Sequence, residues 1–347
     1  MTMFQTKHKI FNSNSQSLED ISDESVELVV TSPPYPMIEM WDGIFSQIDE
    51  KISQHLSNKE GKKAHNRMHY ALEEVWEELY RVVKPGGIVC INIGDATRSI
   101  NGTFRKFDNT REISKRMELI GFDTLPSIHW RKPTNSPTKF LGSGMLPVNA
   151  YVTLEHENIL IFRKEELRKF SDSEKEKRYK SALFWNERNE LFVDEWTDIT
   201  GAIQKNDSGN RDRSAAYPLE IPHRLIKMFS IYGDTILDPF WGTGTTTTAA
   251  MCTGRSSIGV EIDESFINSY KTDDVIELSK SMANRRYLTQ EKNIKQTNTK
   301  YKSNIYDIDV KTKQEKQIEL YITNEILETN KNCKREFISN HKKMNIS

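Results

Sequence analysis

The chain has 347 residues, which is enough for one large α/β domain with insertions or for two unequal domains. Its 49 basic and 50 acidic residues give a net charge of -1, which excludes a uniformly basic nucleic-acid binder but allows a locally basic face. The longest apolar runs, such as Val26–Val30 and Ile159–Phe162, are far shorter than the roughly 20 residues of a membrane span, and Met1–Ile10 is too polar for a signal. Three widely separated cysteines argue against a disulfide framework or a structural zinc site, so we expect no metal and a cytoplasmic location.

Short apolar runs alternate with segments of helical periodicity along the chain. In chain order, the pattern predicts strand Val26–Val30, helix His65–Val83, strand Ile88–Ile93, helix Thr110–Ile120, strands Ser127–Trp130 and Asn158–Phe162, helix Ile221–Ile231, strand Asp234–Asp238, a helix that begins at Thr245 and strand Ser256–Ile262. This alternation predicts an α/β fold with a doubly wound, mostly parallel sheet that helices cover on both faces.

Three segments lie outside this pattern. Two insertions stand at about 42–66 and 163–212, and no strong core pattern continues beyond Lys280. Residues 281–347 carry a net charge of about +6, which suggests an anionic partner, although a solvated tail would have the same composition. We therefore expect one α/β domain over residues 1–280 and a basic C-terminal extension over residues 281–347.

A glycine turn follows the strand that ends at Asp238. Gly242 and Gly244 let the backbone turn tightly before the next helix, which brings backbone N–H groups close to a ligand. Glu261 ends the following strand, where a carboxylate accepts the two hydroxyl groups of a ribose. Many α/β turns carry a glycine pair, and Glu261 alone is equally a solvated strand end. Together, the two motifs indicate a cofactor that contains a nucleoside.

The segment Ser32-Pro33-Pro34-Tyr35 follows the first predicted strand. Two consecutive prolines fix two φ angles and present carbonyl oxygens without N–H groups. Ser32 adds a hydroxyl group, and Tyr35 adds a ring that stacks on a flat group. The segment suits an exocyclic amine on a planar base, and as an isolated motif it is also consistent with a plain proline turn.

The order of these two motifs resembles that of S-adenosylmethionine-dependent DNA amino-methyltransferases of the permuted β group, over most of Ile10–Tyr270. The resemblance implies a Rossmann-like methyltransferase fold with a circularly permuted motif order, S-adenosyl-L-methionine as cofactor, and double-stranded DNA as partner. It makes residues 1–280 the catalytic domain and the two insertions candidates for DNA target recognition. The implied catalytic residues are Ser32, Pro33, Pro34 and Tyr35, and the implied cofactor-binding residues are Asp238, Phe240, Gly242, Gly244, Thr245, Glu261, Asn14, Tyr217 and Leu219. The chain departs from the family at Ser13-Asn14, where Gly-Asp is common, so Asn14 takes the place of the aspartate.

The resemblance also implies a mechanism. The Ser32 hydroxyl and the Pro33 carbonyl would hold the hydrogens of an exocyclic amine, so that its lone pair is localised on nitrogen. The base would leave the duplex to reach this position, and Tyr35 would stack on it. Serine at the first position is associated mostly with cytosine-N4 methylation, so we expect a site-specific cytosine-N4 enzyme of a restriction-modification system. The alternative is adenine-N6 methylation, which the chemistry of Ser32 does not forbid.

Other classes of protein fit the sequence poorly. A cytosine-C5 enzyme needs a cysteine after proline, and none of the three cysteines stands there. An NAD-dependent dehydrogenase or a non-catalytic nucleotide-binding protein would leave Ser32–Tyr35 without a purpose. We expect a monomer or homodimer with a cognate restriction endonuclease as a further partner. The candidate phosphate contacts are Lys132, Lys139, Arg163, Lys164 and Arg168.

Overall fold

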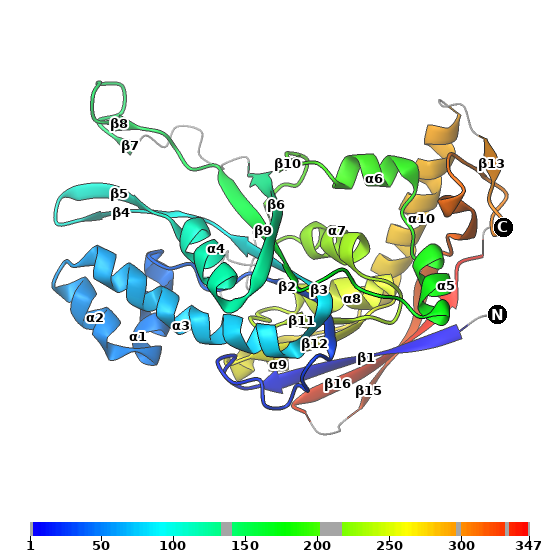
Figure 1. The fold of residues 1–347 in the computed structure, drawn as a ribbon, viewed down its shortest axis with the longest axis horizontal. Coiled ribbons are helices and arrows are strands. Elements are labelled where there is room, and N and C mark those ends of the chain that lie inside the picture. The colour runs from blue at the N-terminus through cyan, green and yellow to red at the C-terminus, as the bar shows by residue number, and fades with distance from the viewer. Residues whose placement is uncertain (1–2, 133–140, 202–216, 296–299, 330–332, 346–347) are drawn as a thin grey trace.

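The computed structural model describes residues 3–132, 141–201, 217–295, 300–329 and 333–345, and one ten-stranded sheet runs through it (Figure 1). The strands follow the order β10-β6-β9-β3-β2-β11-β12-β1-β16-β15. Their bounds are β1 Met3–Asn12, β2 Val26–Thr31, β3 Val83–Ile93, β6 Phe122–Arg131, β9 His156–Lys164, β10 Glu195–Trp196, β11 Thr235–Asp238, β12 Ser256–Glu261, β15 Tyr321–Thr329 and β16 Arg335–Lys343.

The five central strands, β3, β2, β11, β12 and β1, pair in parallel. On one side, β9 runs antiparallel between β3 and β6, and on the other, β16 runs antiparallel between β1 and β15. Such a parallel centre needs crossover connections, which the helices supply. The predicted α/β class with a mostly parallel, doubly wound sheet is confirmed.

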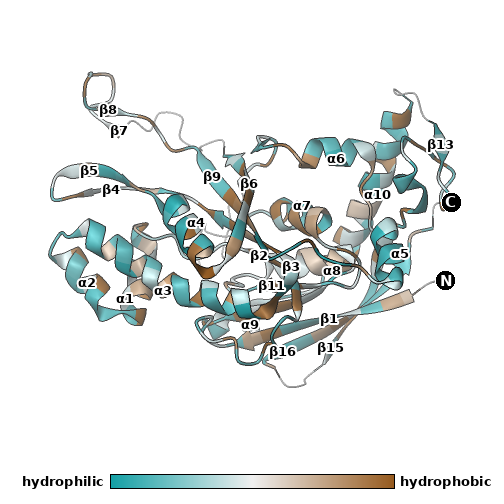
Figure 2. Cartoon of the chain, in the orientation of Figure 1, coloured by the Kyte–Doolittle hydropathy of each residue, from teal (hydrophilic) through white to brown (hydrophobic). Residues whose placement is uncertain are grey.

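Helices cover both faces of the sheet, and each face has its own core. One face is covered by α3 (Gly61–Val82) and α4 (Asn109–Ile120), with α1 (Asp42–Ile48) and α2 (Glu50–Ser57) packed beside α3, and the other packs mainly against α7 (Glu220–Phe229) and α8 (Thr245–Thr253). In β2, Val29 belongs to the first core while Leu28 and Val30 belong to the second, as alternating side chains of a fully buried strand must. Figure 2 shows hydrophobic residues along these central strands.

The remaining elements lie around this frame. They are η1 (Glu39–Trp41), β4 (Ala96–Ile100), β5 (Thr103–Phe107), β7 (Leu141–Gly142), β8 (Ala150–Tyr151), α5 (Asp172–Lys180), α6 (Trp185–Leu191), α9 (Glu264–Ser269), α10 (Val275–Ile294), β13 (Tyr301–Lys302), β14 (Asp309–Val310) and η2 (Gln314–Gln317). Among the helices in the described ranges, none has the length and apolar composition that crossing a membrane requires.

The C-terminal part of the chain differs from its predicted form. The boundary expected at residue 280 falls inside α10, and β15 and β16 continue the central sheet. Their buried face is largely polar: His341 lies 2.7 Å from the Thr6 hydroxyl of β1, and the Thr323 hydroxyl donates to the Met251 carbonyl at 2.8 Å. Buried groups that satisfy one another in this way leave no apolar alternation in the sequence, which is why the pattern appeared to stop.

The two predicted insertions have different structures. Segment 42–66 forms α1, α2 and the start of α3. Segment 163–212 begins inside β9, whose last two residues are Arg163 and Lys164, and continues through α5, α6 and β10 until the described residues stop at 201. The start of this second insertion was therefore placed two residues too early.

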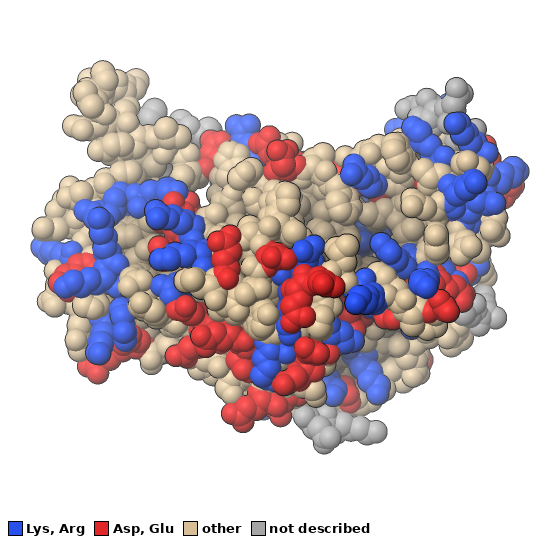
Figure 3. All heavy atoms as spheres, viewed as in Figure 1, with Lys and Arg blue, Asp and Glu red and all other residues tan. Residues whose placement is uncertain are grey.

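An arm that carries β7 and β8 was not anticipated. It joins β6 to β9 and exposes Met145, Leu146, Val148 and Val152, each at least 70% exposed. In Figure 3 it forms an uncharged projection at the upper left, above a surface with several Lys and Arg side chains. Tyr151 of this arm stacks on Phe104 of the β4–β5 hairpin with ring centroids 4.7 Å apart, so the two projections support each other.

Candidate active site

The two sequence motifs meet at the carboxyl edge of the parallel strands. The loop after β2 carries Ser32–Tyr35, and the loop after the neighbouring β11 carries the glycine turn. The sheet builds outward from this pair in opposite directions, through β3 on one side and β12 on the other (Figure 1). Such a switch point leaves a crevice outside the strand ends, which is where open α/β sheets bind ligands.

The two glycines of the turn, Gly242 and Gly244, have different surroundings. Both have left-handed backbones, with φ of 53° at Gly242 and 81° at Gly244. A Cβ on Gly244 would lie 2.7 Å from the rings of Trp241 and Tyr270, whereas a Cβ on Gly242 would meet only the Phe240 carbonyl at 3.8 Å. The backbone is therefore open to a ligand at Gly242, while Gly244 is required by the packing of the protein itself.

Glu261 at the end of β12 faces the same turn. Its Oε2 accepts the Gly242 N–H at 2.8 Å, and its Oε1 accepts the Asp263 N–H at 2.8 Å. Burial raises the pKa of this carboxyl, against the effect of these two hydrogen bonds. Each carboxylate oxygen can accept a second hydrogen bond. The open backbone at Gly242 beside this anchored carboxylate fits the ribose of a nucleoside cofactor.

Asp238 is placed differently from the prediction. It is 3% exposed, and its carboxylate accepts hydrogen bonds from the hydroxyls of Thr31 at 2.7 Å and Thr246 at 2.6 Å and from the Phe240 N–H at 3.1 Å. The Tyr217 hydroxyl also donates to it, at 3.4 Å. Asp238 thus links the end of β2 to the loop that carries the glycine turn. All its described contacts are to the protein itself.

The other predicted cofactor residues surround this turn. Asn14 is exposed and its side chain forms a local turn with Gln16, while the adjacent Ser15 hydroxyl donates to the Pro239 carbonyl. The Phe240 ring lies edge-on to Trp76 with centroids 6.1 Å apart. Thr245 opens α8, Leu219 packs against both neighbouring cores, and the Tyr217 hydroxyl lies 2.5 Å from that of Thr246.

The Ser32–Tyr35 segment contacts two residues that sequence reasoning missed. Ser32 Oγ lies 3.1 Å from the Tyr35 hydroxyl, which donates to Glu157 Oε2 at 2.9 Å. Asn92 Nδ2 donates to the Tyr35 oxygen at 2.8 Å and to Glu157 Oε2 at 2.6 Å. Lys132 forms an ion pair with the other oxygen of Glu157. The available signals were an amide inside the apolar run Ile88–Ile93 and a carboxyl just before the strand 158–162.

The predicted phosphate contacts do not lie together. Lys132 is at the catalytic edge, but antiparallel β9 carries Arg163 and Lys164 to the opposite edge, where Ile88 at the start of the apolar part of β3 pairs with Arg163. There Arg163 pairs with Asp123, the buried Lys164 donates to the Val83 carbonyl, and Arg168 pairs with Asp234. The expectation for these three residues is wrong, because strand direction is not visible in sequence. Lys139 lies outside the described residues.

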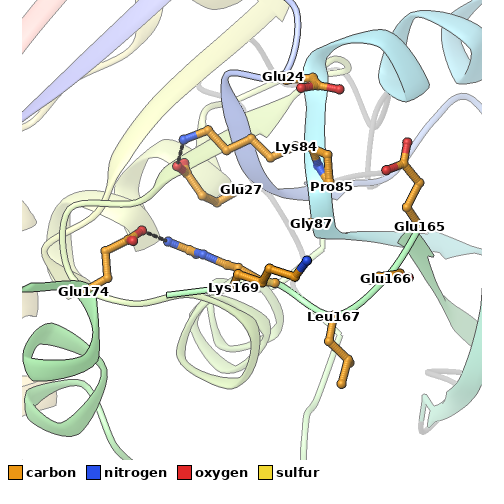
Figure 4. Close-up of a pocket in the computed structure, with 11 residues that line it drawn as sticks. Glu24, Glu27, Lys84, Pro85, Gly87, Glu165, Glu166, Leu167, Lys169 and Glu174 are labelled. Carbon is orange, nitrogen blue, oxygen red and sulfur yellow. Dashed lines mark hydrogen bonds and ion pairs between the residues drawn. The ribbon is translucent and has the colours of Figure 1, made fainter. Parts of the chain in front are cut away.

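A hollow of about 470 Å³ lies at this opposite edge (Figure 4). Ion pairs cross it, from Lys84 to Glu27 and from Arg168 to Glu174. The glycine turn and Ser32 are not among its lining residues. We therefore do not assign the active site to this hollow.

Comparison with known proteins places the chain in a family. A family model described as DNA methylase matches residues 26–272. The type II methyltransferase M.MthZI of Methanothermobacter thermautotrophicus is 50% identical over 321 residues, which cover 91% of this chain and 90% of that protein. The type II methyltransferase M.MjaI of Methanocaldococcus jannaschii is 53% identical over 271 residues, which cover 75% of this chain and 88% of that protein.

Solved structures agree. TTHA0409 of Thermus thermophilus, a candidate DNA modification methylase solved with S-adenosyl-L-methionine, is 30% identical and superposes with a TM-score of 0.59, covering 75% of this chain and 90% of that one. The PvuII DNA methyltransferase (cytosine-N4-specific) superposes with a TM-score of 0.51 over 78% of this chain and 90% of that one, and at 17% identity it supports the fold alone. The expected cofactor, S-adenosyl-L-methionine, is confirmed. With a family match over 247 of its 347 residues and two relatives of about 50% identity, the chain belongs to the N6/N4 DNA methylase family.

Proposed function

We propose that this chain methylates the exocyclic N4 of cytosine at a specific site in duplex DNA, as the modification enzyme of a type II restriction-modification system. The observation that carries the proposal is the neutral Ser32-Pro33-Pro34-Tyr35 segment at the end of β2, directly beside the glycine turn of β11. Its relatives M.MthZI and M.MjaI are both type II methyltransferases, which supports the assignment to such a system.

The site would work by positioning. When bound, S-adenosyl-L-methionine supplies an electrophilic methyl group. The Ser32 hydroxyl and Pro33 carbonyl accept the hydrogens of the target amine, which localises its lone pair and aims it at the cofactor side of the crevice. Among the predicted cofactor residues, the open backbone at Gly242 and the carboxylate of Glu261 hold the nucleoside.

The DNA must lie across the carboxyl edge, because the target base has to reach Ser32. The β7–β8 arm rises from this edge, since it joins the ends of β6 and β9 next to Lys132 and Glu157. We include the arm, together with segment 42–66 and the part of the second insertion around β10, which pairs with β6, among the parts that face the duplex.

The methylated atom decides between the two branches of the family. Unmethylated plasmid DNA would be methylated in vitro, digested to nucleosides and resolved by mass spectrometry. We expect N4-methylcytosine. N6-methyladenine as the sole product would refute the choice of base and leave the DNA methylase assignment intact.

Ser32→Ala tests the catalytic segment. The variant should bind S-adenosyl-L-methionine normally, because Ser32 lies in the loop after β2 and the glycine turn lies in the separate loop after β11. Its kcat should fall on the order of 10²-fold or more, as when other preorganised hydrogen-bond groups are removed. Calorimetry would measure cofactor binding and radiolabelled methyl transfer would measure turnover; a near-normal kcat would remove Ser32 from the mechanism.

A further inference from the structure

We propose that Glu157 is a positioning residue for methyl transfer: acting through the Tyr35 hydroxyl, its carboxylate turns the Ser32 proton away from the target amine and so makes Ser32 Oγ an acceptor. This inference rests on the proposed function, because it assigns a task to a residue of the same site. Neither Glu157 nor the Tyr35 hydroxyl was expected to take part from the sequence.

The direction of the hydrogen bonds follows from counting protons. A phenol has one proton, and Tyr35 donates it to Glu157 Oε2 at 2.9 Å. The Tyr35 oxygen then acts as acceptor, for Asn92 Nδ2 at 2.8 Å and for Ser32, whose Oγ is 3.1 Å away. The Ser32 proton therefore points toward Tyr35. The lone pairs of Ser32 Oγ remain to accept a hydrogen from the target amine.

The surroundings of Glu157 hold this arrangement in place. Its side chain is only 13% exposed, Asn92 is 2% exposed, and Lys132 balances the charge on the other carboxylate oxygen. Burial and the Glu157 charge raise the pKa of Tyr35 well above its usual value, so the phenol stays protonated and remains a donor. Without this series of hydrogen bonds, the Ser32 hydroxyl would rotate freely and could present its proton to the amine instead.

The same series of hydrogen bonds, from Ser32 through Tyr35 to Glu157, also provides a path for the proton that leaves the amine. Once methylated, the nitrogen breaks one N–H bond and its proton moves to Ser32 Oγ. The Ser32 proton then moves to the Tyr35 oxygen, and the Tyr35 proton moves to Glu157 Oε2, along the contacts of 3.1 Å and 2.9 Å. Each hydroxyl oxygen gains one proton and passes one on, and Glu157 keeps the last proton, so that Glu157 ends neutral and both hydroxyls are restored. Glu157 afterwards returns its proton to water.

An amide cannot replace this carboxylate. Glu157 accepts on both oxygens, from Tyr35 and Asn92 on one and from Lys132 on the other. A glutamine has one acceptor oxygen, so one side must face an NH₂ group. Tyr35→Phe removes the middle hydroxyl of the same series of hydrogen bonds. Glu277→Gln is the control for the same carboxylate-to-amide change, since Glu277 lies on α10, outside the proposed site, and pairs with Lys280 among the ion pairs of the described residues.

The test measures single-turnover methylation of unmethylated plasmid DNA with tritium-labelled S-adenosyl-L-methionine, for the full-length chain and its variants. We expect Glu157→Gln and Tyr35→Phe to lower the rate about ten-fold or more at unchanged cofactor Kd. The double variant should be no slower than the slower single variant, because both changes interrupt the same series of hydrogen bonds. Glu277→Gln should match the wild type, and Glu157→Asp, which keeps the charge, should exceed Glu157→Gln.

Three results would overturn the proposal: a wild-type rate for Glu157→Gln, rate losses that multiply in the double variant, or loss of cofactor binding in both Glu157→Gln and Glu157→Asp, which would make the residue structural. Failure of the proposed function is distinguishable, because in that case the wild-type chain itself would not produce N4-methylcytosine.

Discussion

A single carboxylate, that of Asp238, joins the end of β2, which precedes the Ser32–Tyr35 segment, to the start of the loop that carries Gly242 and Gly244. It is buried and accepts from Thr31, Thr246 and the Phe240 N–H. An unpaired buried donor costs about 1–3 kcal/mol. The relative position of the two loops should therefore depend largely on Asp238, a residue that does not itself face the crevice.

Replacing Asp238 should reveal a dependence of stability on pH. Burial raises its pKa above the ordinary value of 3.8, against its hydrogen bonds to Thr246 and Thr31. A raised carboxyl pKa means that the stability present at low pH is lost as the pH rises through the folded pKa. Relative to Asp238→Asn, the wild type should therefore lose unfolding free energy as the pH rises above about 4. Urea unfolding over a pH series would measure this difference; a wild type that gains on the variant as pH rises would contradict it.

At the scale of elements, the two glycines of the turn before α8 should have different roles: Gly244 in folding and Gly242 in cofactor binding. Gly244→Val should prevent normal folding, because its side chain meets the rings of Trp241 and Tyr270. Gly242→Ala has room for its methyl group and suffers only the left-handed backbone, which costs about 1–2 kcal/mol. It should remain folded and bind S-adenosyl-L-methionine more weakly. Circular dichroism and calorimetry would check both; a folded Gly244→Val with weak binding alone would restore the simpler view that both glycines serve the cofactor.

The elements also show how far sequence reasoning reaches. Strands β2, β3, β9, β11 and β12 were predicted because they are buried among apolar residues on both faces. The strands β15 and β16 were not, because Thr323, Ser339 and His341 fill their buried positions. In the proposed site, the motifs point to Ser32 and Glu261, whereas Glu157 lies on a strand that is far away in sequence and adjacent only through the pairing of β9 with β3.

At the scale of the whole molecule, residues 281–347 are part of the sheet. Truncation after Lys280 would cut α10 and remove β16, which pairs with β1 from Met3 to Ile10. The buried His8 and Thr6 of β1 would lose their cover, and β1 would become an exposed edge that pairs with other chains. We expect the truncated chain to aggregate. Size-exclusion chromatography and circular dichroism would show this; a monomeric, folded fragment that binds cofactor would make the segment dispensable.

If the Ser32–Tyr35 segment receives the target base and the glycine turn receives the cofactor, the hydrogen bond from Thr31 to Asp238 joins the two binding sites. The Ser32–Tyr35 segment and the Phe240 backbone share one rigid anchor, so an adjustment of either loop on ligand binding reaches the other. Such heterotropic coupling is reciprocal: the factor by which cofactor changes the affinity for DNA equals the factor by which DNA changes the affinity for cofactor. In the proposed site, each ligand would therefore change the affinity for the other through the buried Asp238 carboxylate.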